Sequence, residues 1–150
     1  MNKKFDFDVA GKRTVVNESE RNQKVVQTMQ CCSYDYMDVV LADFGEIQND
    51  CLIHKVRPAI VISSTGYNTN SPVMQVIPMT KKMKNIDSSY HVFIDMKDCE
   101  NLNNSGVAMI EQLCTIDRAH VVHWIGTIVD ERLIEKIQTA VKQQFGLEGC

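Results

Sequence analysis

Short strand-like segments separated by polar loops fill most of this sequence, and a single amphipathic helix follows them. The strand-like segments are Asp38–Phe44, Arg57–Ser64, Pro72–Pro78, His91–Met96, Gly106–Ile116 and Ile125–Val129. No helical pattern separates one of these segments from the next, which argues against a fold built from βαβ units. The spacing therefore predicts a mainly β protein with a C-terminal helix (α+β), arranged as a small β-barrel.

The segments between the predicted strands are rich in polar and turn-forming residues. We expect loops over Glu46–Lys55, Lys81–Ser89 and Lys97–Ser105, and a turn over Thr65–Asn70, where Gly and Asn favour turns. After the last strand, Asp130 is a predicted helix cap and Gly146 a predicted terminator. Between these two residues, the apolar residues repeat at helical spacing: Leu133, Ile134, Ile137, Val141 and Phe145.

The first 33 residues differ in character from the rest of the chain. Phe5, Phe7 and Val9 alternate with other residues, as in a short edge strand, and Glu18–Gln30 has the pattern of an amphipathic helix. Residues 1–33 carry a net charge of +2, whereas residues 34–150 carry −5. We therefore expect an N-terminal helical extension over 1–33 and a barrel domain over 34–150.

Length and composition exclude several classes of protein. The chain has 150 residues, the size of one domain, and its longest apolar runs are about four residues. A membrane-spanning helix needs about 20 apolar residues, so we expect a cytoplasmic protein without a membrane partner. The six cysteines form no C-x-x-C pair and are expected to be reduced thiols. The acidic balance argues against a broad basic nucleic-acid surface, although a compact groove with a few cations stays compatible with it.

Common catalytic and metal-binding motifs are missing from the sequence. It has no phosphate-binding glycine loop, no zinc protease motif and no G-x-S-x-G. His120 and His123 are the one close histidine pair, but residues three apart on a strand point to opposite faces. We therefore expect neither a metal site nor a cofactor.

Two polar residues at strand ends suggest a site for phosphate. Arg57 begins one predicted strand and Thr80 follows the next one, so antiparallel pairing of these strands would bring the two residues together. A guanidinium beside a hydroxyl suits a phosphate, and Lys81, Lys82 and Lys84 lie next to Thr80 in the sequence. The alternative is that Arg57 is a solvated edge charge and Thr80 is structural.

These segments also resemble, in order, the MazF/PemK family of mRNA-cleaving toxins. The similar stretches are DVVLADFG from Asp38, RPAIVIS from Arg57, NSP from Asn70, VIPMT from Val76, EQLCTID from Glu111 and the Ile125–Gly126 pair. The resemblance runs from about Tyr36 to Leu147. Cys114 stands where relatives usually have Arg, and residues 1–33 have no counterpart in the short forms of the family.

The resemblance implies an SH3-like small β-barrel of the PemK/CcdB type, a homodimer and a cognate antitoxin. It also implies metal-independent, sequence-selective cleavage of single-stranded mRNA, in which the 2′-hydroxyl attacks the phosphodiester to leave a 2′,3′-cyclic phosphate and a 5′-hydroxyl. Arg57 and Thr80 match the catalytic positions of the family. Glu111 aligns with an acidic position implicated in some relatives and is the first candidate for proton transfer, and His54 is a competing candidate.

Other residues and roles follow from the same resemblance. Lys81, Lys82, Lys84, Tyr67 and Asn68 are candidate RNA-binding residues, and Tyr67 either stacks on a base or packs on its own turn. The extension either packs on the barrel or dimer, or covers the RNA groove and modifies partner binding. The alternative function is a non-catalytic binding protein on the same fold, either a gyrase poison or a degenerate binder of RNA or antitoxin.

Overall fold

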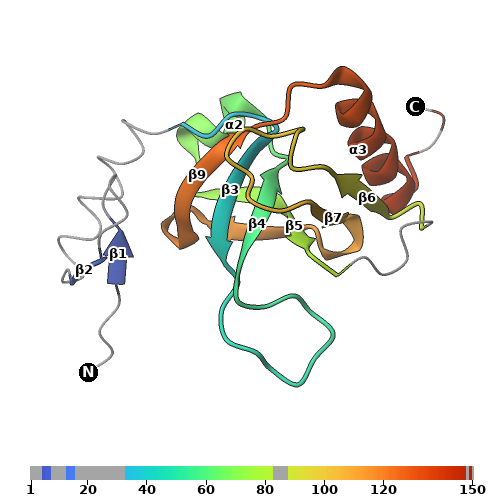
Figure 1. The fold of residues 1–150 in the computed structure, drawn as a ribbon. Helices are drawn as coiled ribbons and strands as arrows, with labels where there is room; N and C mark the ends of the chain where they lie inside the picture. The colour runs from blue at the N-terminus through green and yellow to red at the C-terminus, as the bar shows by residue number, and fades with distance from the viewer. Residues whose placement is uncertain (1–4, 8–12, 16–32, 83–87, 148, 150) are drawn as a thin grey trace.

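The fold is an antiparallel sheet of short strands with one long helix packed against it (Figure 1). The computed structural model describes residues 5–7, 13–15, 33–82, 88–147 and 149. Its strands are β1 (Phe5–Phe7), β2 (Arg13–Val15), β3 (Asp38–Asp43), β4 (Val56–Val61), β5 (Val73–Thr80), β6 (His91–Ile94), β7 (Gly106–Met109), β8 (Cys114–Asp117) and β9 (Val121–Thr127). Its helices are α2 (Thr65–Asn70), α3 (Glu131–Gln144) and the 3₁₀ turns η1 (Ile110–Gln112) and η2 (Arg118–His120).

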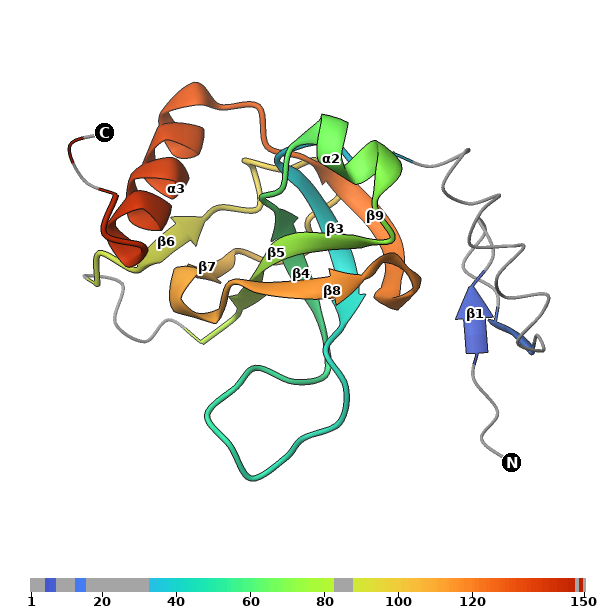
Figure 2. The same cartoon turned by 180° about the vertical axis from the view of Figure 1, so that it is seen from behind.

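The sheet is organised around the long strand β5. The strand order is β6-β7-β5-β4-β3-β9, and β8 also pairs with β5. One edge of β5 pairs with β4, while its other edge pairs with β8 over Val73–Val76 and with β7 at Met79 and Thr80. Figure 2 shows β8 running beside β5. This arrangement confirms the predicted mainly β fold with a C-terminal helix.

Alternating side chains divide the interior into two apolar clusters. The larger cluster contains Val39, Ile60 and Ile77 from the central strands, together with Leu133 and Ile137 of α3. Residues of opposite parity form the second cluster: Val40, Ala42, Ala59, Val61, Met74, Val76, Ile116 and Val121. Strands β3, β4 and β5 thus contribute side chains to both clusters, and the nearly continuous apolar run from Arg57 is typical of a strand buried on both faces.

Helix α3 begins and ends where the sequence predicts. The Asp130 side chain accepts a hydrogen bond from the Arg132 backbone N–H at 3.0 Å, and Gly146 has a φ of +65°. The helix contacts η1 and β6, and it buries Leu133, Ile137 and Ala140.

Loss of the α3 cap is expected to lower stability by a modest amount. Asp130→Ala leaves a backbone N–H of the first turn without its partner and should cost about 1 kcal/mol in the free energy of unfolding. Asp130→Asn keeps an acceptor oxygen and is the matched control. Urea unfolding of the three proteins measures the difference, and equal midpoints for Asp130→Ala and wild type would contradict the capping role.

Three predicted elements differ from the structure. Thr65–Asn70 is the short helix α2, whose cap Ser64 accepts from the Tyr67 backbone N–H, and not a turn. The predicted strand Gly106–Ile116 is broken by η1 into β7 and β8, which pair with different parts of β5. Strand β9 begins at Val121, four residues before the predicted strand Ile125–Val129.

The N-terminal region is described only in part. Strand β1 lies within the predicted edge strand and pairs antiparallel with β2, with Phe5 opposite Val15. The predicted helix Glu18–Gln30 lies outside the described residues. Within the described part of the chain, no helix is long and apolar enough to cross a bilayer.

Candidate functional site

Arg57 and Thr80 come from adjacent strands that run in opposite directions. Strands β4 and β5 pair with Ala59 opposite Pro78 and Val61 opposite Val76. The pairing ends at Ala59 and Pro78, so Arg57 lies two residues beyond it on β4 and Thr80 two residues beyond it on β5, at the same end of the strand pair. The antiparallel pairing on which the phosphate-site hypothesis depends is therefore present.

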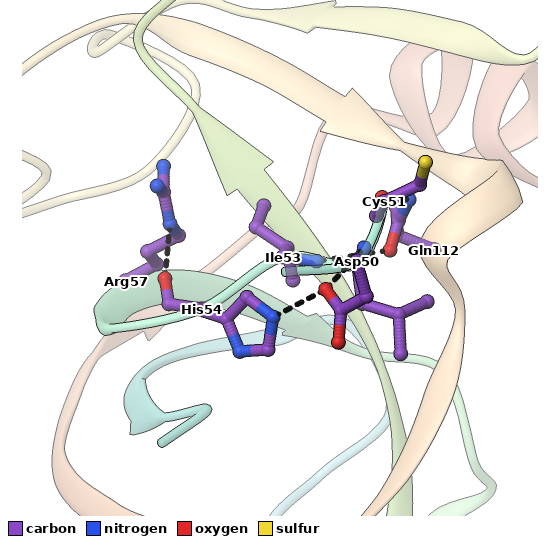
Figure 3. Close-up of polar contacts among 7 residues, drawn as sticks. Asp50, Cys51, Ile53, His54, Arg57 and Gln112 are labelled. Atoms are coloured by element: carbon purple, nitrogen blue, oxygen red, sulfur yellow. Dashed lines mark hydrogen bonds and ion pairs between the residues drawn. The ribbon is translucent and has the colours of Figure 1, made fainter. Parts of the chain in front are cut away.

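The Arg57 side chain is half-buried and oriented by a single backbone carbonyl. Its Nε donates to the His54 carbonyl oxygen at 2.6 Å (Figure 3). The two terminal nitrogens of the guanidinium make no hydrogen bond or ion pair to any of the described residues. They remain available for a bidentate contact with an anion.

Thr80 ends β5 and is followed by exposed cations. Its Oγ1 accepts a hydrogen bond from the Lys82 backbone N–H at 3.3 Å. Lys81 and Lys82 are exposed, and Lys84 lies outside the described residues. The two described lysines thus give the end of β5 a positive charge.

The segment between β3 and β4 is a long loop that projects from the barrel at the Arg57 end of β4 (Figure 1). Its neck is closed by backbone hydrogen bonds from Phe44 N to Lys55 O at 3.0 Å and from Lys55 N to Gly45 O at 2.7 Å. Gly45 and Lys55 both have positive φ, +84° and +69°. Both residues therefore have the left-handed backbone conformation at the base of the loop.

Within this loop, His54 is paired with Asp50. The His54 Nε2 and Asp50 Oδ1 atoms lie 2.7 Å apart. The hydrogen bond from His54, with a second one from the Leu52 backbone N–H, holds the pKa of Asp50 below its ordinary value of 3.8. An ionised carboxylate only accepts, so Nε2 carries the hydrogen and Nδ1 of a neutral ring is the acceptor. Nδ1 is buried and has no hydrogen-bond partner among the described residues.

Gln112 connects the same loop to the barrel. Its side-chain oxygen accepts from the Ile53 backbone N–H at 3.2 Å, and its Nε2 donates to the Cys51 carbonyl at 3.1 Å (Figure 3). Both ends of the amide are thus used to hold the loop against η1.

Glu111 lies on η1 and not inside a strand, which corrects its predicted position. Its Oε1 atom is 2.7 Å from His91 Nε2, and the Glu111 side chain is 34% exposed. Because the carboxylate has a partner and reaches solvent, its position does not carry the cost of a buried, unpaired charge.

A cavity of about 450 Å³ lies between the loop and the η1–β8 segment. It brings His54 and Glu111 to one space, so the two candidates for proton transfer share a cavity. Its other lining residues are Asp43, Phe44, Gly45, Leu52, Ile53, Gln112, Leu113, Cys114, Thr115, Ile116 and His120. Arg57 and Thr80 are not among the residues that line it.

Tyr67 and Asn68 do not line this cavity. Helix α2 joins the end of β4 to the start of β5, at the opposite end of this strand pair from Arg57 and Thr80 (Figure 1). The Tyr67 side chain is exposed. Asn68 is 1% exposed, and its amide donates to the carbonyls of Tyr34 and Ser63 at 2.9 and 3.0 Å. Asn68 therefore stabilises α2 from inside the fold, and we do not assign it a contact with RNA.

The described cysteines differ sharply in exposure. Cys51 in the loop is exposed, whereas burial raises the pKa of Cys114 and raises that of Cys99 to about 11, with smaller contributions from Asp38, Asp98 and Glu100. All three are free thiols. The thiolate is the reactive form, so exposure and pKa together decide which thiol is alkylated.

We expect iodoacetamide at pH 8 to modify Cys51 much faster than Cys99 or Cys114 in the native protein. Peptide mass spectrometry measures the rate at each site, and labelling in urea is the control that equalises them. Equal native rates at Cys51 and Cys99 would contradict the burial described here.

The raised pKa of Cys99 also predicts how stability depends on pH. Below about pH 9 the thiol is protonated in both the folded and the unfolded chain, so its ionisation does not change stability. Between about pH 9 and pH 11 the unfolded chain ionises first, so the folded state should lose stability.

Sequence reasoning missed Asp50 and Gln112. Asp50 lies four residues before His54, and Gln112 directly follows Glu111, but neither spacing is a recognised motif. Their contacts depend on the path of the loop. Among the described residues, no cluster of three or more His, Cys, Asp or Glu could hold a metal ion. The site thus offers a guanidinium and a hydroxyl for an anion, and two histidine–carboxylate pairs for proton transfer.

Solved toxin structures share this fold. MazF from Deinococcus radiodurans has 20% sequence identity and a TM-score of 0.63, and the match covers 77% of this chain and 98% of that one. An endoribonuclease from a mycobacterial species, solved in complex with its cognate antitoxin, has 15% identity and a TM-score of 0.63, with coverage of 79% and 100%. The Mycobacterium tuberculosis toxin MazF-mt6 has 16% identity and a TM-score of 0.59, with coverage of 73% and 96%.

The sequence itself is matched at the level of a family. A search of proteins with curated functions finds no match. Residues 35–145, however, match the model of the PemK-like, MazF-like toxins of type II toxin–antitoxin systems. That range contains the whole of the sheet from β3 to β9 together with α3. The chain therefore belongs to the family of PemK-like, MazF-like toxins.

Proposed function

We propose that this protein is an endoribonuclease toxin that cleaves single-stranded mRNA without a metal ion. The observation that supports the proposal is the antiparallel pairing of β4 with β5, in which the start of β4, with Arg57, and the end of β5, with Thr80, lie at the same end of the strand pair, within a fold shared with proteins named as endoribonucleases. The two open nitrogens of Arg57 and the Thr80 hydroxyl suit the oxygens of a phosphodiester.

In the proposed reaction, the ribose 2′-oxygen attacks the adjacent phosphorus while the bond to the 5′-oxygen of the next nucleotide breaks. The products are a 2′,3′-cyclic phosphate and a 5′-hydroxyl. Arg57 stabilises the negative charge that develops on the phosphorane, and Thr80 donates a hydrogen bond to a non-bridging oxygen. Arg57 is unsuited to act as a base because its side chain stays protonated.

Two protons move in this reaction, one from the 2′-hydroxyl and one to the leaving 5′-oxygen. Glu111 and His54 are the proposed groups for these transfers, since both line the same cavity. Each is held by a partner at 2.7 Å, Glu111 by His91 and His54 by Asp50. The pairs fix the orientation of the two side chains.

The proposed setting is the cytoplasm, where mRNA is available. We propose that the protein acts as a homodimer and that a cognate antitoxin neutralises it, as the complex of the mycobacterial endoribonuclease suggests. Lys81, Lys82 and the exposed Tyr67 are proposed to contact the RNA, the lysines through phosphate and the tyrosine by stacking on a base.

The test is incubation of the purified protein with a long single-stranded RNA in EDTA, followed by analysis of the RNA ends. Cuts that persist in EDTA and end in 2′,3′-cyclic phosphate are the expected result. Cuts that need added divalent metal would contradict metal independence. Intact RNA in the presence of folded protein would contradict the nuclease proposal and favour a binding role.

A further inference from the structure

We infer that Gln112 is a positioning residue that holds the loop between β3 and β4 and, through it, the side chain of Arg57. The consequence for RNA cleavage rests on the proposed function, whereas the effect on Arg57 itself does not. Gln112 lies 59 residues from Ile53 and 61 residues from Cys51 in the sequence, yet it bonds to the backbone of both.

The Gln112 amide joins the loop as a neighbouring strand would. Its oxygen accepts from Ile53 N and its nitrogen donates to Cys51 O, at 3.2 and 3.1 Å. These two backbone groups belong to residues two apart, as do the acceptor and donor that one residue of a parallel strand contacts in the strand beside it. A primary amide satisfies both at once, whereas a carboxylate satisfies only the N–H.

The next residue along the loop reaches Arg57. His54 follows Ile53 directly, and its carbonyl accepts from Arg57 Nε at 2.6 Å. The His54 side chain is itself held to Asp50, whose carboxylate also accepts from the Leu52 N–H. Residues 50–54 therefore form one internally bonded unit, and Gln112 fixes that unit to the barrel (Figure 3).

This chain of contacts sets the plane of the guanidinium. Holding Nε leaves the two terminal nitrogens directed away from the loop backbone as a fork, and a fork oriented before the substrate arrives loses less freedom on binding. Without Gln112 the 50–54 unit keeps its internal bonds but loses its tie to η1. The His54 carbonyl would then no longer hold Arg57 in one place.

The first measurement follows the Arg57 Nε–H signal by NMR in ¹⁵N-labelled protein without RNA. Arg57→Lys identifies the signal by removing it. We expect solvent exchange of this hydrogen to be faster in Gln112→Ala and unchanged in Gln75→Ala. Gln75 is a matched control because its side chain also bridges two segments, donating to Thr115 Oγ1 at 3.3 Å, but makes no side-chain hydrogen bond to the described residues of the loop. Exchange at the wild-type rate in Gln112→Ala would overturn the inference.

The second measurement is steady-state cleavage of a short RNA. We expect Gln112→Ala to lower kcat by about 10- to 100-fold with little change in KM, because the loss concerns orientation in the transition state. Gln112→Glu, which keeps the acceptor for Ile53 N–H, should lie between Gln112→Ala and wild type. Thermal melting of each variant separates these effects from unfolding.

A double variant decides whether Gln112 acts through Arg57. If it does, adding Gln112→Ala to Arg57→Ala causes little further loss, since the side chain to be positioned is already gone. Fully multiplicative losses would overturn the inference. Absence of cleavage by the wild-type protein would instead defeat the proposed function, and the NMR comparison would still test the tie to Arg57.

Discussion

Arg57→Ala is expected to lower RNA cleavage by about 100- to 1000-fold while the fold remains intact. That range is typical for removal of one donor that stabilises charge in a transition state. Arg57 is half-buried and its Nε bonds only a backbone carbonyl, so truncation leaves no buried carboxylate without a partner. Cleavage of a short RNA under single-turnover conditions, with circular dichroism as the check on folding, measures the effect.

Removing a positive charge elsewhere in the protein distinguishes the bidentate contact of the Arg57 guanidinium from a general electrostatic attraction of RNA. Lys142→Ala removes an exposed charge near the end of α3. We expect it to change the cleavage rate far less than Arg57→Ala does. Arg57→Lys keeps the charge but not the bidentate geometry, and we expect it to resemble Arg57→Ala more than wild type. Full activity in Arg57→Ala would remove this residue from the mechanism.

The strands and the C-terminal helix could be predicted because their patterns are local. The apolar residues of β5 and the apolar run of β4 follow directly from the sequence, as does the cap at Asp130. The break of Gly106–Ile116 at η1 was not predicted, because the two polar residues Glu111 and Gln112 are flanked by apolar residues on both sides. Its cause is tertiary: β7 and β8 pair with different parts of β5, so the chain must change direction between them.

The sequence did not predict helix α2 or the start of strand β9, for related reasons. The TGYNTN segment has weak helix propensity, and long-range contacts stabilise it, including the bonds of buried Asn68 and the Arg118 Nη1 donor to the Asn68 carbonyl at 2.7 Å. Strand β9 shows poor alternation because its register with β3 shifts twice, between Val39 and Val40 and between Leu41 and Ala42.

The residues of the candidate site also differ in whether the sequence could predict them. The location of Arg57 and Thr80 at the same end of the β4–β5 pair needs only antiparallel pairing of consecutive strands, which the sequence favours. The contacts of Asp50, His91 and Gln112 need the path of a loop and of a 3₁₀ turn, and no sequence spacing specifies either. Sequence patterns therefore locate the anion-binding residues, while the structure supplies the groups that orient them.

Gly106→Ala is expected to destabilise the fold and to impair cleavage through Thr80. A Cβ at this position would lie 2.8 Å from the Thr80 carbonyl oxygen and 3.4 Å from its carbonyl carbon. Both are backbone atoms, so the strand itself must move. Overpacking of this kind costs about 1–3 kcal/mol in the free energy of unfolding. Because the displaced residue is Thr80, the molecules that remain folded should also cleave RNA more slowly.

Two further glycines distinguish these effects. Gly126→Ala would place a Cβ 2.5 Å from the Glu100 carbonyl oxygen and 2.9 Å from Cys99 Sγ, so it should destabilise the fold without moving β5. Gly66→Ala, in α2, meets nothing within 4 Å and should be neutral or slightly stabilising. Urea unfolding gives the stability of each variant, and the cleavage rate per folded molecule gives the local effect. Equal rates per folded molecule for Gly106→Ala and Gly126→Ala would show that displacement of Thr80 does not impair the reaction, and that Thr80 has no part in binding the phosphate.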